Sequence, residues 1–122
     1  MSHIVQIKTQ IRDASALAAA CGRLGLQAPV QGTASLFSGM ASGLLVQRPG
    51  WTYPAVINTA SGEIQFDNYQ GKWGEQKEMD RLLQAYAVEK ARIEARRAGH
   101  TVSETVLADG SIKLTIGIGG GT

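Results

Sequence analysis

The chain has 122 residues and a formal net charge of +2, which arises from 12 basic and 10 acidic side chains. This length suits one globular domain, and a composition of 43% hydrophobic and 18% charged residues excludes a disordered or fibrous chain. Because the net charge is small, we expect no membrane partner and do not favour nucleic acid as a partner.

Cys21 is the only cysteine, so the chain cannot form an internal disulfide, and nothing indicates an oxidising compartment. Residues 1–10 lack the apolar core of a signal peptide. No apolar run approaches the roughly 18 residues that a membrane span needs. These observations predict a cytoplasmic protein.

The N-terminal region predicts a strand followed by a helix. Apolar and polar residues alternate from Val5 to Ile11, which is typical of a half-buried strand. Asp13 can then cap a helix, and Gly25 supplies its left-handed stop. Cys21 falls on the apolar face of this helix and has no nearby charge to lower its pKa, so we interpret it as a core residue rather than a reactive thiol.

The middle of the chain predicts several short strands. Apolar runs at 44–47, 55–57 and 64–66 alternate with turn residues, and residues 58–62 are a plausible hairpin loop. The stretch from Gly32 to Gly43 is rich in Gly, Ser and Ala. Its pattern favours a weakly specified strand and a mobile loop equally.

Residues 75–98 carry the longest helical signal. An apolar stripe at spacings of three and four residues contains Met79, Leu82, Leu83 and Tyr86. Beyond Tyr86 the same face carries both charged and apolar residues: Lys90, Ile93 and Arg97. This change predicts that the last turns leave the core or contact a partner.

Two further strands, 101–107 and 111–118, follow the helix. Asp109 and Gly110 between them favour a tight type I′ turn. A loop of these two residues would place Leu107 opposite Ile112 and Thr105 opposite Leu114, with Val102 and Val106 on the other face.

The order of elements is strand, helix, three to four strands, helix and hairpin. It predicts one α+β domain over residues 1–118, with a mainly antiparallel sheet and two helices packed on it. A flexible, glycine-rich tail is expected at residues 119–122.

Catalytic and metal-binding patterns are weak. His3 and His100 are the only imidazoles, and no acidic cluster or G-x-S-x-G elbow accompanies them. We therefore expect no catalytic residue, cofactor or metal site. Copper or nickel binding by His3 near the chain start, and a small enzyme or ligand-binding site on the central strands, stay open as alternatives.

Our leading hypothesis is a non-catalytic protein-binding accessory protein or homo-oligomer. Its contact surface would include the end of the long helix, with Lys90, Ile93 and Arg97. It would also include the exposed part of two aromatic residues, Trp51 and Trp73. The basic residues of this helix end could also attract nucleic acid, although cations there equally offset the helix dipole.

The tail raises a second hypothesis. Ubiquitin-like modifiers present a C-terminal Gly-Gly for conjugation, and trimming of Thr122 would expose Gly120 and Gly121 in this position. A frayed chain end is the simpler interpretation of the same residues.

Several segments resemble the hypothetical chloroplast reading frame thirty-five family of cyanobacteria, plastids and other bacteria. The resemblance rests on Met1–Ile4, Ile7–Ile11, Leu83–Ala87, Gly99–Glu104 and Asp109–Leu114. It covers both ends of the chain but not residues 29–51, and the glycine-rich tail departs from the family pattern. The resemblance implies a small accessory protein, sometimes encoded near ATPase or ferredoxin-like genes, and brings no catalytic residues.

Overall fold

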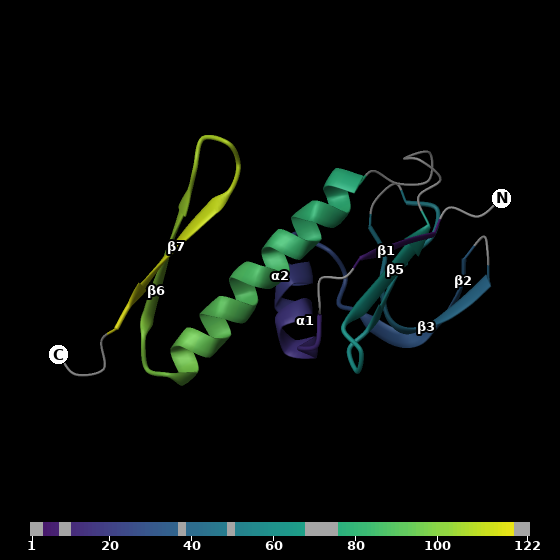
Figure 1. The fold of residues 1–122 in the computed structure, drawn as a ribbon, viewed down its shortest axis with the longest axis horizontal. Helices are drawn as coiled ribbons and strands as arrows, with labels where there is room; N and C mark the ends of the chain where they lie inside the picture. Colours follow the sequence, from purple (N-terminus) through teal and green to yellow (C-terminus); the bar gives the residue numbers. More distant parts are fainter. Residues whose placement is uncertain (1–3, 8–10, 37–38, 49–50, 68–75, 119–122) are drawn as a thin grey trace.

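Two helices pack on one face of a five-stranded antiparallel sheet, and a separate hairpin lies on the far side of the second helix (Figure 1). The computed structural model describes residues 4–7, 11–36, 39–48, 51–67 and 76–118. The helices are α1 (Ala14–Arg23) and α2 (Gln76–Arg97). The strands are β1 (Ile4–Ile7), β2 (Val30–Leu36), β3 (Gly39–Val46), β4 (Ala55–Asn58), β5 (Glu63–Asp67), β6 (Thr101–Val106) and β7 (Ile112–Gly117).

The large sheet has the strand order β1-β5-β4-β3-β2, and all its neighbours are antiparallel. β4 and β5 form the predicted hairpin. Its loop is closed by the amide of Gly62, which donates to the carbonyl of Asn58, while the Asn58 side chain accepts from the amides of Ala60 and Ser61. An Asn side chain that bonds the backbone ahead of it is a common way to start a turn.

α1 begins and ends as its sequence predicts. The Asp13 carboxylate accepts a hydrogen bond of 3.0 Å from the amide of Ala16, which satisfies one of the unpaired amides at the helix start. At the other end, Gly25 has φ +73° and the Leu26 amide reaches back to the Cys21 carbonyl. This bond pattern is a Schellman motif, which needs a residue that tolerates positive φ.

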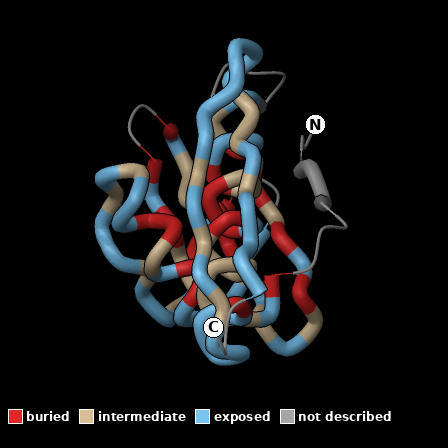
Figure 2. The backbone as a smooth tube through the Cα atoms, turned by 90° about the vertical axis from the view of Figure 1, so that its left-hand side faces the viewer, coloured by how far each residue is buried: buried red, intermediate tan, exposed pale blue. Residues whose placement is uncertain are grey.

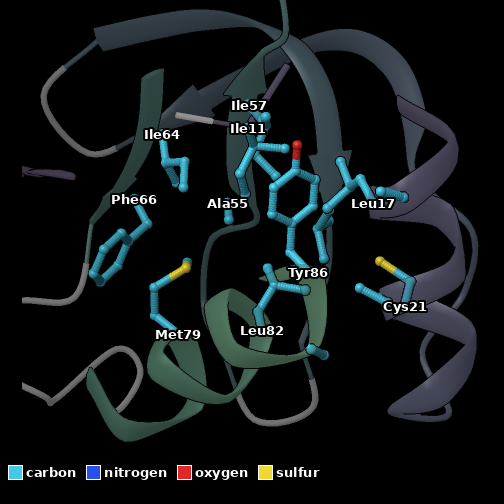
Figure 3. Close-up of a cluster of buried hydrophobic side chains, with 14 of the residues drawn as sticks. Ile11, Leu17, Cys21, Ala55, Ile57, Ile64, Phe66, Met79, Leu82 and Tyr86 are labelled. Carbon is cyan, nitrogen blue, oxygen red and sulfur yellow. The ribbon is translucent and has the colours of Figure 1, made fainter. Parts of the chain in front are cut away.

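The main core lies between the helices and the sheet (Figure 3). α2 contributes Met79, Leu82 and Tyr86, as its apolar stripe predicts, and α1 contributes Leu17 and Cys21. The sheet contributes Ala55, Ile57, Ile64 and Phe66. A smaller cluster covers the opposite face of the sheet and includes Ala34, Leu36 and Val56.

The glycine-rich stretch forms strands rather than a loop in its described part. β2 and β3 pair from Val30 opposite Leu45 to Leu36 opposite Gly39. A Cβ atom at Gly43 would come within 2.9 Å of the carbonyl carbon of Ile57, so glycine lets β3 and β4 approach closely.

The C-terminal hairpin corrects our predicted register. The amide of Leu107 donates to the carbonyl of Ser111 at 2.8 Å, so the loop has three residues, not two. Val106 therefore lies opposite Ile112, and the predicted pairing of Leu107 with Ile112 is wrong. Gly110, with φ +88°, takes the left-handed position that a three-residue loop requires.

The fold is the predicted α+β class. In the part of the chain that the structure describes, neither helix is long and apolar enough to cross a membrane. His3, Trp73 and the tail at 119–122 lie outside the described residues.

Candidate functional site

The C-terminal hairpin packs on the face of α2 that points away from the sheet (Figure 1). Gln84 of α2 donates a 3.2 Å hydrogen bond to the carbonyl of Gly110, at the tip of the hairpin. Val88 and Ala95 lie on the same helical face as Gln84, and both are buried. α2 thus has two packed faces, of which the sequence stripe predicted one.

A charge network joins the hairpin to both helices. The Glu104 carboxylate of β6 accepts two hydrogen bonds of 2.8 Å from Arg23 of α1 and one of 2.6 Å from Arg92 of α2. Glu89 of α2 lies 3.3 Å from the Arg23 guanidinium. The hydrogen bonds from Arg23 hold the pKa of Glu104 below its ordinary value, and the charge of Arg92 adds to the effect.

The corrected register gathers the apolar side chains of both hairpin strands on one face. By strand alternation this face carries Val102 and Val106 of β6 with Ile112, Leu114 and Ile116 of β7. The opposite face carries Ser, Thr and Lys residues. The apolar face is the one that meets α2, because it also carries Glu104.

α2 covers this apolar face incompletely. Val102, Ile112 and Leu114 are half-buried, whereas Val106 is 71% exposed and Ile116 is 44% exposed. Leu107, between β6 and the loop, and Ile118, after β7, are exposed as well. Four of the six exposed large hydrophobic residues in the described chain belong to this region: Val106, Leu107, Ile116 and Ile118. Figure 2 shows the hairpin in front of the molecule, with exposed and intermediate residues along both strands.

The predicted contact residues at the end of α2 have different surroundings. The Lys90 amine lies 3.2 Å from the Asp13 carboxylate and 3.1 Å from that of Glu94. The hydrogen bonds that Lys90 donates, first to Glu94 and then to Asp13, raise the pKa of Lys90. Ile93 is partly buried against the main core, and Arg97 is exposed in the last turn.

Trp51, one of the two aromatic residues of the predicted surface, is buried. Trp51 is 7% exposed, and its ring lies 5.2 Å from that of Phe66, so little of it is offered to a partner. Trp73 lies outside the described residues. Trp51 therefore offers little exposed surface, and the role of the predicted set in binding stays a prediction.

Near Trp51, Arg48 is 5% exposed and forms an ion pair with Glu78 of α2. The hydrogen bond from Arg48 lowers the pKa of the Glu78 carboxyl. Two other guanidinium nitrogens of Arg48, Nε and Nη1, are buried without a partner. This arrangement ties the end of β3 to the start of α2.

The described surface contains small hollows. One of about 230 Å³ lies beside Val30, Leu45 and Pro54, and its lining has no titratable side chain. Another of about 200 Å³ is polar and includes Asn58 and Glu63. Pockets for small organic ligands usually enclose about 300–1,000 Å³. An open hollow between the start of α2 and the hairpin loop reaches about 300 Å³ and includes Asp80, Arg81 and Asp109, so the enzyme or ligand-binding alternative stays a prediction.

Among the described residues, no group of three or more His, Cys, Asp or Glu side chains could hold a metal ion. Cys21 is fully buried, and burial raises the pKa of its thiol. A protonated thiol is a poor nucleophile. Cys21 thus belongs to the main core, as its place on the apolar face of α1 predicts.

Comparisons of the chain with protein-family models, with curated proteins and with solved structures give no match. The resemblance to the hypothetical chloroplast reading frame thirty-five family stays a prediction. Sequence reasoning did not single out Glu104, the residue that joins the hairpin to the helices. The strand alternation could have indicated Glu104. It lies between Val102 and Val106 on the same side of the strand, where a carboxylate needs a positively charged partner.

Proposed function

We propose that this chain is a non-catalytic protein-binding accessory module that contacts its partner through the C-terminal hairpin. The observation that carries the proposal is the incomplete cover of the hairpin's apolar face, where Val106 and Ile116 remain exposed and Ile118 is 83% exposed. Exposed apolar side chains that gather on one element often mark an interaction site.

Two further observations favour the hairpin, rather than the end of α2, as the surface that contacts the partner. Lys90 is already engaged by Asp13 and Glu94, and Ile93 is partly buried in the core, so both are less available to a partner. The hairpin also has strand edges that could accept another strand. The accessory role implied by the family resemblance, and a cytoplasmic location with a reduced Cys21, belong to the same proposal.

The test is affinity purification of the tagged chain from cells that naturally express it, followed by mass spectrometry. We expect the double variant Val106→Ser, Ile118→Ser to lose the protein that the unaltered chain retains. Met40→Ser is the matched control, because Met40 is 69% exposed on the five-stranded sheet, far along the chain from the hairpin.

Loss of binding in the hairpin variant but not in Met40→Ser would support the proposal. Retention of the same protein by the hairpin variant would overturn it. If only Arg97→Ala lost the captured protein, the binding site would lie at the end of α2 instead. A chain that neither self-associates nor retains any protein would also overturn the proposal.

A further inference from the structure

The outer edge of β7 is not paired with another described strand. Because the Leu107 amide bonds to the Ser111 carbonyl, the alternation of an antiparallel pair directs the backbone groups of Lys113 and Thr115 toward β6. The amides and carbonyls of Ile112, Leu114 and Ile116 therefore lie on the outer edge. This edge has no proline and one charged side chain, so little protects it from pairing with a further strand.

The sequence of this edge is symmetric about Thr115. When a second copy of Ile112–Ile118 runs antiparallel to the first, centred on Thr115, Leu114 lies opposite Ile116. Ile112 then lies opposite Ile118. We propose that two copies of this chain associate by antiparallel pairing of β7 with β7 of the second copy, about a two-fold axis at Thr115. This inference rests on the proposed function and names the partner of the same hairpin as a second copy.

Hydrogen-bond geometry and charge are both compatible with this register. Outward-facing backbone groups meet outward-facing groups, since 112, 114, 116 and 118 pair only with one another. Lys113 lies opposite Gly117 of the second copy, so no like charges meet. A two-fold at Lys113 would oppose two lysines, and pairing through β6 with the axis at Glu104 would oppose two carboxylates.

The same arrangement explains the incomplete cover of the hairpin. Antiparallel pairing about a two-fold normal to the sheet keeps both apolar faces on one side, each with its own α2. Ile116 then lies beside Leu114 of the second copy, which is half-buried under its own helix. An isolated two-stranded hairpin is only marginally stable in water, whereas a four-stranded sheet packed on helices is a stable unit.

The first test measures the mass of the full chain by sedimentation over a wide range of protein concentration. We expect a dimer for the unaltered chain and a monomer for Ile116→Pro, because proline removes an amide on the outer edge of β7. Val102→Pro is the matched control. Val102 lies directly opposite Ile116, and its amide lies on the outer edge of β6 instead, so this variant stays dimeric.

The second test keeps the edge intact, so it stands even where a proline variant fails to fold. Thr115→Cys places two thiols at a non-hydrogen-bonded pair, where Cα atoms lie about 4.5 Å apart and a disulfide can form. We expect mild oxidation to give a covalent dimer of Thr115→Cys. Ser103→Cys, opposite Thr115 on the same outer face, stays uncrosslinked, and native Cys21 is buried.

A monomer at every concentration, dissociation by Val102→Pro rather than by Ile116→Pro, or equal crosslinking of Ser103→Cys would overturn the inference. A monomeric chain whose hairpin variant still loses a different captured protein would overturn the second copy as partner and leave the proposed function standing. A monomeric chain that retains its captured protein after the hairpin substitutions would overturn both.

Discussion

At the residue scale, the ion pair of Arg48 and Glu78 is asymmetric in its burial. The Arg48 side chain is 5% exposed, whereas the Glu78 side chain is 25% exposed and also lies 3.7 Å from Arg81. Two buried nitrogens of Arg48 have no partner, which already costs free energy in the native protein. Glu78 is the only described counter-charge of this desolvated cation, so loss of Glu78 costs more stability than loss of Arg48.

This asymmetry makes a testable prediction. Glu78→Ala leaves the Arg48 guanidinium buried without a counter-charge and is expected to lower the free energy of unfolding by about 3 kcal/mol. Arg48→Met removes the buried cation and its unpaired nitrogens, while Glu78 can still be hydrated, so its cost is expected to be well below that of Glu78→Ala. Urea unfolding of both variants measures the two costs. An equal or larger loss in Arg48→Met would contradict this account.

At the element scale, the hairpin depends on few contacts with the rest of the chain. Its apolar face is only half-covered, and one carboxylate, Glu104, joins it to both helices. Segments with few buried contacts open locally at low free energy. The hairpin is therefore expected to open before the five-stranded sheet does.

Glu104→Gln tests this dependence. The substitution removes the negative charge that Arg23 and Arg92 share, so we expect amide hydrogen exchange to accelerate more in β6 and β7 than in β4 and β5. Glu94→Gln is the control, because Glu94 is 59% exposed and pairs with Lys90 on the same helix. Equal acceleration in the hairpin and in the sheet would show that Glu104 supports the whole fold instead.

The sequence predicted most elements because local patterns determine them. The Asp13 cap, the Gly25 stop and the stripe on α2 each depend on neighbours within a few residues. The hairpin register escaped prediction because Asp109 and Gly110 suit both a two-residue and a three-residue loop. Only the apolar alternation of the two strands, which the three-residue loop aligns on one face, distinguishes these loops.

The candidate site was harder to predict than the elements, because it depends on packing across the chain. Trp51 follows a turn and could have covered the surface, but its ring fills the core beside Phe66. Lys90 interrupts an apolar stripe, and only the position of Asp13 on α1, far along the chain, explains it. Such long-range pairs leave no periodic trace in the sequence.

At the scale of the whole molecule, three carboxylates with lowered pKa values join elements that are distant in sequence. Asp13 links α1 to α2, Glu78 links α2 to the end of β3, and Glu104 links the hairpin to both helices. The pKa of each is lowered, first by the Ala16 amide for Asp13, by Arg48 for Glu78 and by Arg23 for Glu104. Each carboxylate thus stabilises the fold in its ionised form.

The sign of the pH dependence follows from these lowered values. The ordinary pKa is 3.8 for Asp13 and 4.5 for Glu78 and Glu104, so the unfolded chain binds protons at a higher pH than the folded chain. Their contribution is therefore complete above about pH 4.5 and is lost as the pH falls through the lower folded-state values. Urea midpoints measured from neutral pH down to the acid range should fall steeply in this window.

The matched comparison is the same titration of Glu104→Gln, which lacks one of the three groups. We expect a lower urea midpoint at neutral pH and a shallower fall in acid. Glutamine does not titrate, and the stabilisation by ionised Glu104 is already absent from this variant at neutral pH. Curves for Glu104→Gln and the unaltered chain should therefore converge as the pH falls. Parallel curves would mean that the ionised Glu104 does not contribute to the stability of the whole molecule, and that the charge network only positions the hairpin.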